Sequence, residues 1–242
     1  MGYAAEWTFD GAVKDNKISF PFPITHRPRL GARMIVRQYV RRYITGLYKE
    51  ITDWLVLSRE RSSNLILFSI IYSEDYMVQF LDNLLVSLYK VVLEKENKNI
   101  MSNVPKALTL LGRYCLPSQY RSLVMDAIRN ELASFYSYTQ AGSLRSLGYL
   151  FEGSCELIFD ASQFERVQEL LNDFMHYTRT QLVLQLDMEL AELLIETLQR
   201  ILQVLTNKLK AKIDPSALIS EHLQDVVEVA LKCLAVFQNY RL

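Results

Sequence analysis

The feature that most constrains this chain is the spacing between three aromatic residues that each open a helical pattern. Tyr76, Tyr120 and Phe164 lie 44 residues apart twice over, and each follows a short polar stretch. Apolar residues continue at helical spacing after them, as at Leu84 and Leu88. A unit that recurs at this length predicts stacked copies of one supersecondary motif.

Each unit is long enough for two helices joined by a short turn. Second helices are predicted at residues 58–72, 100–114 and 142–152, and Pro105 should delay or kink the middle one. A period of about 40 to 47 residues is typical of two-helix HEAT units. The sequence therefore predicts an all-α fold, an α-solenoid of HEAT-type antiparallel helix pairs, with about four and a half repeats over residues 31–242.

The two ends of the chain differ from this pattern. Residues 1–30 contain glycine and proline, including two prolines at 21 and 23, and are expected to form an extended N-terminal arm or a disordered tail. Further helices are predicted at 162–179 and 187–209, and Asp214-Pro215 predicts one more helix start. That last helix is apolar to its end, which favours a portion of a longer array or a helix covered by a partner.

Composition excludes several classes of protein. Lys+Arg and Asp+Glu balance at 27 each, so net charge gives no reason to expect nucleic acid or an anionic membrane as a partner. Cys115, Cys155 and Cys233 are far apart and are expected to be reduced. The longest apolar stretch, residues 65–72, is too short to span a bilayer. These observations predict a cytoplasmic protein.

Motifs for catalysis or cofactor binding are missing from the sequence. It contains neither a phosphate-binding glycine loop, nor a nucleophile elbow, nor H-E-x-x-H. Glu169, Asp173 and His176 share one predicted helix face and are the best candidates for a metal site, with an exposed polar face as the alternative. We therefore predict no catalytic, cofactor-binding or metal residues, and keep a helical metal-dependent enzyme only as a remote alternative.

A tight turn between the helices predicted at 34–48 and 58–72 contains Asp53 and Trp54. Asp53 is predicted to cap the second helix and to pair with Arg59 or with an arginine of a neighbouring repeat, as HEAT turns do. Trp54 is predicted to pack between adjacent repeats, in which case Trp54→Ala would cost roughly 3–5 kcal/mol.

A row of arginines precedes this turn. Arg29, Arg33, Arg37 and Arg41 recur at every fourth position, and Arg42 lies beside the last of them. Four-residue steps place guanidinium groups along one helix face, where they could bind carboxylates of an acidic partner. A solvated face is the alternative. As a docking face, the row should tolerate charge reversal with little change in stability.

These stretches also resemble a known family. The residues concerned are Arg27-Pro28-Arg29-Leu30-Gly31-Ala32-Arg33, Asp53-Trp54 with Ser58, Arg59, Arg61 and Ser62, and Ser73-Glu74-Asp75. Over about residues 26–180 the sequence resembles the HEAT-repeat axonemal dynein assembly factor family. The resemblance implies a non-catalytic cytoplasmic scaffold, part of a longer array, that aids preassembly of dynein arms for cilia and flagella.

The same resemblance implies dynein chains and chaperones as partners, and no cofactor. A generic HEAT or armadillo adaptor, in transport or phosphatase-type complexes, is the alternative within the class of interaction proteins.

Overall fold

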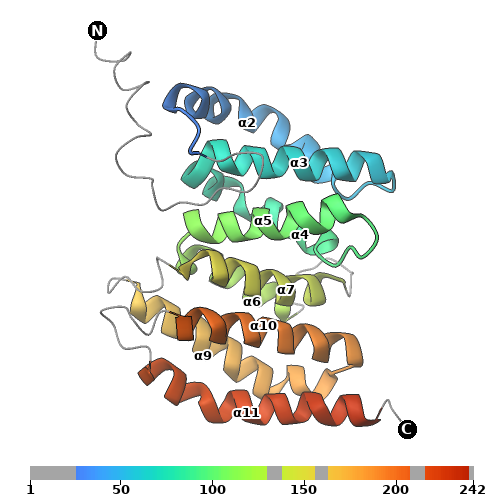
Figure 1. The fold of residues 1–242 in the computed structure, drawn as a ribbon, viewed down its shortest axis with the longest axis vertical. Helices are drawn as coiled ribbons and strands as arrows, with labels where there is room; N and C mark the ends of the chain where they lie inside the picture. Colours follow the sequence, from blue (N-terminus) through green and yellow to red (C-terminus); the bar gives the residue numbers. More distant parts are fainter. Residues whose placement is uncertain (1–25, 130–137, 156–162, 208–215, 240–242) are drawn as a thin grey trace.

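The computed structural model describes residues 26–129, 138–155, 163–207 and 216–239. All regular elements among these residues are helices, which confirms the predicted all-α fold (Figure 1). The α-helices are α2 (Leu30–Glu50), α3 (Val56–Ser73), α4 (Leu81–Val91), α5 (Lys98–Tyr114), α6 (Pro117–Ile128), α7 (Tyr138–Gly153), α9 (Phe164–Thr180), α10 (Met188–Asn207) and α11 (Ser216–Asn239). Two 3-10 helices, η1 (Glu74–Phe80) and η2 (Leu182–Gln185), join neighbouring helices.

The helices stack in two layers. In one layer α3 packs on α5, α5 on α7, and α7 on α10. In the other layer α4 contacts both α2 and α6, and α9 contacts both α6 and α11. Figure 1 shows this stack running from α2 at one end to α11 at the other. The arrangement confirms the predicted solenoid of HEAT-type helix pairs.

Helix starts follow the predicted period. Elements begin at Glu74, Pro117 and Phe164, at or just before the three spaced aromatic residues. The predicted late start of the helix around Pro105 is wrong, because α5 already begins at Lys98 and contains the proline. Its start is fixed by the Asn97 side chain, which accepts hydrogen bonds from two backbone N–H groups of the first turn.

Other expectations lie beyond the described residues. Residues 1–25 of the predicted arm and the Asp214-Pro215 helix start are among them, and α2 begins at Leu30. The boundary of the arm and the number of repeats stay predictions.

The core runs along the whole stack. Buried apolar side chains come from every α-helix, and α10 contributes Leu194, Leu198, Ile201 and Leu205 from its predicted leucine stripe. Leucine at three- to four-residue spacing places one continuous stripe against the neighbouring helices. The interior is thus a line of small interfaces between successive helices.

Glycines allow the helices around α7 to approach closely. A Cβ atom added to Gly112 of α5 would be 2.0 Å from the carbonyl oxygen of Leu150, and one on Gly153 would be 1.8 Å from that of Thr109. The absence of a side chain at Gly112 and Gly153 therefore lets the α5 and α7 backbones come together at one end of both helices. No residue with a side chain fits there without moving a helix.

The last helix is apolar on two sides. Val229 and Cys233 of α11 are buried, whereas a second set of large apolar residues on the same helix is exposed. That exposed set is Leu223, Val227, Leu231 and Leu234. Within the described part of the chain, no helix is long and apolar enough to cross a membrane.

Candidate functional site

The turn between α2 and α3 differs from its prediction. Helix α3 has Leu55 as its N-cap residue and no side-chain cap. Asp53 only accepts a long hydrogen bond of 3.4 Å from the Leu55 backbone N–H. The predicted capping by Asp53 is therefore wrong, because α3 begins too late in the chain for this carboxylate to reach the orphan N–H groups of its first turn.

Arg59 pairs with a different carboxylate. Its Nη1 lies 2.5 Å from Glu94 Oε2, in the segment between α4 and α5. A hydrogen bond from the Glu96 backbone N–H is the largest influence on the pKa of Glu94. Burial opposes it, but with the Arg59 charge it holds that pKa below its usual value. Arg59 thus joins two successive helix pairs through a glutamate, and the predicted pair between Asp53 and Arg59 does not form.

Trp54 is exposed. Its side chain is 84% accessible, so the prediction that it packs between repeats is wrong. The next three residues, Leu55, Val56 and Leu57, are also exposed, which makes the turn an apolar tip. Because α3 starts only at Val56, the short turn holds Trp54 beyond the ends of both helices, out of reach of the next pair.

The arginine row is largely paired within the chain. Glu74 is buried and accepts hydrogen bonds from Arg33 Nη1 at 2.6 Å and from Arg27 Nε at 2.6 Å. Arg37 Nη2 lies 2.6 Å from Asp75 Oδ1 and 3.2 Å from Glu74 Oε2. Arg33 is itself buried and so cannot meet a partner directly.

Glu74, which accepts hydrogen bonds from these arginines, has an unusual backbone conformation. Its φ of 52° is the one positive value at a non-glycine position among the described residues. Such a conformation is costly for a residue with a side chain. Burial on its own raises the pKa of Glu74, but hydrogen bonds and charges from Arg27 and Arg33 together outweigh it and lower that pKa.

The outer arginines remain at the surface. Arg29, Arg41 and Arg42 are exposed, with Arg41 donating to Gln79 at 2.6 Å and Arg42 stacked over the Tyr39 ring at 4.9 Å. A docking role for the row, which stays a prediction, is thus restricted to these three residues.

The candidate metal cluster is held by an arginine. Arg121 of α6 donates to Asp173 from Nε at 2.9 Å and from Nη2 at 2.7 Å, and it also pairs with Glu169. His176 is exposed and has no part in this contact. Across the described ranges, no group of three or more metal-ligating side chains converges. The carboxylates therefore join α6 to α9.

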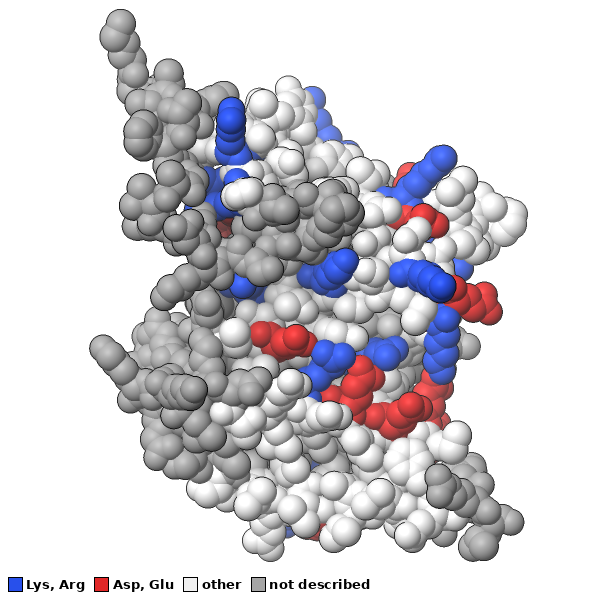
Figure 2. Space-filling model, viewed as in Figure 1, with Lys and Arg blue, Asp and Glu red and all other residues white. Residues whose placement is uncertain are grey.

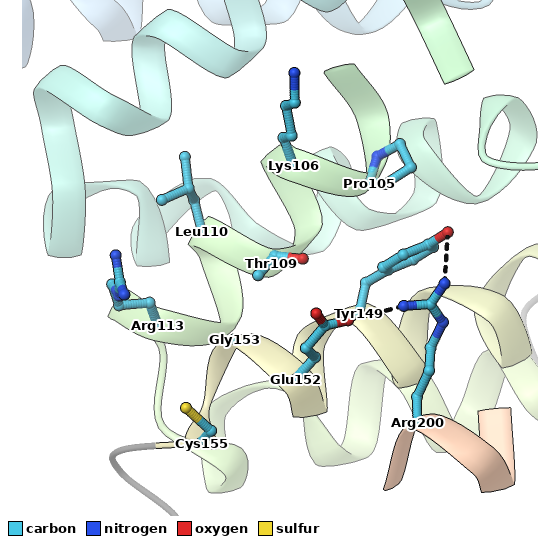
Figure 3. Close-up of a pocket in the computed structure, with 10 residues that line it drawn as sticks. All are labelled: Pro105, Lys106, Thr109, Leu110, Arg113, Tyr149, Glu152, Gly153, Cys155 and Arg200. Atoms are coloured by element: carbon cyan, nitrogen blue, oxygen red, sulfur yellow. Dashed lines mark hydrogen bonds and ion pairs between the residues drawn. The ribbon is translucent and has the colours of Figure 1, made fainter. Parts of the chain in front are cut away.

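A groove in the layer of α3, α5, α7 and α10 is the site that sequence reasoning missed (Figure 3). It encloses a cavity of about 590 Å³, within the usual size range of ligand pockets. The lining residues are Pro105, Lys106, Thr109, Leu110, Arg113, Tyr149, Glu152, Gly153, Cys155 and Arg200. We call this the α5–α7–α10 groove.

Arg200 forms a fixed wall of the groove. Its guanidinium lies 4.1 Å from the centroid of the Tyr149 ring, and its Nη1 is 2.8 Å from Glu152 Oε2. Nη2 also reaches Glu196 at 3.2 Å. Figure 3 shows Tyr149 and Arg200 at one end of the cavity and Arg113 and Cys155 at the other. Two carboxylates and one aromatic ring thus compensate and orient this cation.

In the groove the α7 backbone comes close to α5. Gly153 lies against the backbone of Thr109, and the ring of Pro105 lines the same side of α5. Proline inside a helix and glycine at a helix crossing were the local signals available in the sequence, but neither indicates which distant side chains meet there.

Figure 2 shows Lys and Arg side chains across the middle of this face, beside Asp and Glu.

The stacked helix pairs define the class of protein, an α-solenoid of HEAT-type repeats. More particularly, the chain belongs to the family described as dynein axonemal assembly factor 5, HEAT-repeat domain, whose family model matches residues 20–156. The predicted family is confirmed, and the match begins before residue 26 and ends before residue 180.

Relatives of the same description support this assignment. Dynein axonemal assembly factor 5 of Xenopus laevis is 26% identical over 119 residues, which is 49% of this chain and 14% of that protein. The protein of the same name from Homo sapiens is 25% identical over 107 residues, or 44% of this chain and 12% of that protein. No solved structure matches the chain.

Proposed function

We propose that this chain is a non-catalytic HEAT-repeat scaffold that aids the cytoplasmic preassembly of axonemal dynein arms for cilia and flagella. The observation that carries the proposal is the family match over residues 20–156, together with relatives named as dynein axonemal assembly factors. The 119 matched residues cover only 14% of the Xenopus protein, so what the relative's name says of the whole protein comes to this chain as a proposal.

The geometry supports this proposal in two ways. The α3, α5, α7 and α10 helices lie side by side, so their outward side chains form one continuous face. That face carries the α5–α7–α10 groove, into which residues of three helices converge. Stacked repeats give extended surfaces of this kind, which suit the binding of protein segments. Dynein chains and chaperones are the partners we propose.

Affinity purification from ciliated cells tests the function. The tagged full chain, captured under mild conditions, should retain dynein chains and chaperones, identified by mass spectrometry against a tag-only control. Recovery of transport cargo or phosphatase subunits in their place would support a general adaptor and contradict the proposal. Capture should be repeated in cells that lack cilia, where dynein chains of the axoneme are expected to be depleted.

A further inference from the structure

Helices α3 and α5 form a continuous outer surface whose register is fixed by hydrogen bonds. Asn99 Nδ2 donates to Glu60 Oε1 at 2.5 Å, and Asn103 Nδ2 donates to Asn64 Oδ1 at 2.9 Å. Both pairs are 39 residues apart in the chain, so the two helices run side by side in the same direction. The outward-facing residues beside this line of contacts, which we call the α3–α5 face, are Leu57, Arg61 and Leu65 of α3 and Lys98, Ser102 and Lys106 of α5.

The α3 part of this face carries a strip of exposed apolar side chains. Leu57 and Leu65 are 58% and 50% exposed, and they lie on one side of α3 about 12 Å apart along the helix axis. The strip continues into the apolar tip, where Trp54, Leu55 and Val56 are also exposed. Exposed apolar surface of this extent is typical of a site where another molecule binds.

The same face carries cations that no carboxylate of the described ranges compensates. Arg61 and Lys98 are exposed and Lys106 is half-buried, and none of the three charged groups has an ion pair or a hydrogen bond within those ranges. Figure 3 shows the Lys106 side chain extended on the side of α5 away from Tyr149. These cations therefore remain available to a ligand.

The carboxylates between α3 and α5 are already engaged. Glu60 accepts hydrogen bonds from Asn97 and Asn99, and Glu94 pairs with Arg59. The α3–α5 face is thus left with an excess of positive charge beside its leucines. Such a surface is complementary to a ligand that combines apolar side chains with carboxylates.

The geometry of the face favours a helix as that ligand. Apolar side chains four residues apart on a helix recur at steps of about 6 Å, which is also the spacing along α3 from Leu57 to Arg61 and from Arg61 to Leu65. The ridge of one helix can then pack into the groove beside the other. An amphipathic helix also places an acidic row at the edge of its apolar stripe, within reach of the α5 lysines.

Two other classes of ligand fit this face less well. Glu50 and Glu96 are exposed in the turns at the tip end of the face, and an anionic bilayer would bring its headgroups against both. A nucleic-acid strand would set charged phosphates against the exposed leucines and leave their apolar surface uncovered. The combination of leucines and cations therefore indicates a protein segment.

We propose that the α3–α5 face binds an acidic amphipathic helix of a protein partner. Apolar side chains of that helix pack on Leu57 and Leu65, and its carboxylates pair with Arg61, Lys98 and Lys106. This inference rests on the proposed scaffold function and adds the chemistry of one ligand and the surface that holds it.

Designed peptides and the purified full chain test the proposal. The probes are fluorescein-labelled, alanine-based helical peptides with leucines along one face and glutamates at its edge. Matched peptides carry glutamine in place of glutamate, or the same residues with the leucines scrambled. Fluorescence anisotropy should show binding of the glutamate peptide that weakens with added salt, binding of the glutamine peptide that is about tenfold weaker, and no binding of the scrambled one.

Matched variants of the chain locate the binding surface. Leu65→Ser should raise the dissociation constant about tenfold, because it removes an apolar contact, whereas Leu184→Ser, at an exposed leucine of η2, should leave it within about twofold. Lys98→Glu should raise it about fivefold, and Arg41→Glu, the same charge change on α2, should leave it within about twofold. All four positions are exposed, so circular dichroism should remain that of the parent chain.

The emission of Trp54 provides a second measurement. In a Trp7→Phe background Trp54 is the single tryptophan, and a bound peptide without tryptophan should shift its emission to shorter wavelengths. Binding that leaves this emission unchanged would place the peptide on another surface and overturn the proposal.

Other results would overturn it as well. These are no binding of the glutamate peptide, equal binding of the glutamine peptide, equal effects of Leu65→Ser and Leu184→Ser, and stronger binding of phosphatidylserine vesicles or single-stranded RNA. Because the assay contains no dynein chain, such a result leaves the co-purification test of the scaffold function unaffected. A chain that binds the peptide as expected but recovers neither dynein chains nor chaperones would contradict the proposed function instead.

Discussion

The backbone of Gly142 in α7 lies so close to Tyr89 in α4 that a Cβ atom on Gly142 would be 1.9 Å from the Tyr89 carbonyl oxygen. Tyr89 is fully buried, and its carbonyl oxygen belongs to helix backbone. No rotation of a side chain can relieve such a contact. Glycine is therefore required at this crossing of α4 and α7 by packing, independently of its backbone freedom.

Replacing glycine by alanine should have opposite effects on stability at Gly142, which has no room for a Cβ atom, and at Gly46, which has room. Gly142→Ala should lower the free energy of unfolding by about 3 kcal/mol or more, because α4 and α7 must separate. Gly46→Ala in α2 should raise it by about 0.5–1 kcal/mol, since nothing lies within 4 Å of the added methyl group and alanine favours helix. Urea unfolding measures both. Equal effects would contradict the close approach.

Arg121 should contribute to the α6–α9 interface. Arg121→Ala should cost about 1 kcal/mol, an estimate reduced because the side chain is 31% exposed and partly screened. Arg121→Lys should recover only part of the loss, because lysine cannot repeat the two hydrogen bonds to Asp173. Lys232→Ala, at an exposed pair on α11, is the control and should change stability by less than about 0.5 kcal/mol. Chemical unfolding of the three variants measures these differences in the free energy of unfolding.

The Glu74 cluster should make stability dependent on pH. Because the pKa of Glu74 is lowered in the folded chain, its contribution is fully present above the unfolded value of 4.5 and is lost as pH falls through the folded pKa. Glu74→Gln should cost about 2–4 kcal/mol at neutral pH, since it leaves the buried Arg33 without its carboxylate. Below pH 4.5 the variant and the parent should converge. A constant difference from neutral to acidic pH would assign the loss to packing.

Charge reversal separates the buried arginine from the exposed ones. Arg33→Glu places a second carboxylate beside Glu74 and should cost at least about 3–5 kcal/mol. Arg41→Glu should change stability by less than about 0.5 kcal/mol, because Arg41 is exposed and its hydrogen bond among the described residues is to the neutral Gln79. Thermal melting monitored by circular dichroism distinguishes them. The expectation that charge reversal leaves stability nearly unchanged therefore holds for the exposed Arg41 and not for the buried Arg33.

The apolar tip should matter little for stability. Trp54→Ala should change the free energy of unfolding by less than about 0.5 kcal/mol, in contrast to the value expected for a buried indole. Phe174→Ala, which truncates a fully buried ring in α9, should cost about 3–5 kcal/mol. Acrylamide quenching in a Trp7→Phe background, where Trp54 is the single tryptophan, gives an independent measure, since an exposed Trp54 should be strongly quenched. A large loss for Trp54→Ala would show that the tip is covered in solution.

The repeat period and the apolar stripes were sufficient to predict the helices and their class, because both follow from helix geometry within one segment. The leucines of α10 show this, since Leu194, Leu198, Ile201 and Leu205 are buried as their spacing requires. The capping rule gave a wrong prediction at the turn between α2 and α3. An aspartate before a helix is a common cap, but α3 begins at Val56, two residues too late for Asp53 to occupy that position.

Contacts between distant segments could not be predicted from spacing. Arg59 meets Glu94, 35 residues away, and Arg121 meets Asp173, 52 residues away. The groove has the same origin, because Lys106, Tyr149 and Arg200 converge only when three helices stack in order. A single sequence specifies which residues lie on each helix face, and the stacking decides which faces meet.

The order of that stack also gives the molecule mechanical properties. Successive helices of one layer pack mainly on their neighbours. Small rotations at each interface therefore add up to a change in the curvature of the whole array. Lys106 and Arg200 belong to α5 and α10, which are separated by α7, and their separation therefore changes with the curvature of the array. A ligand held between α5 and α10 would therefore favour the curvature at which the groove fits it. Small-angle X-ray scattering would report such a change in curvature as a change in the radius of gyration.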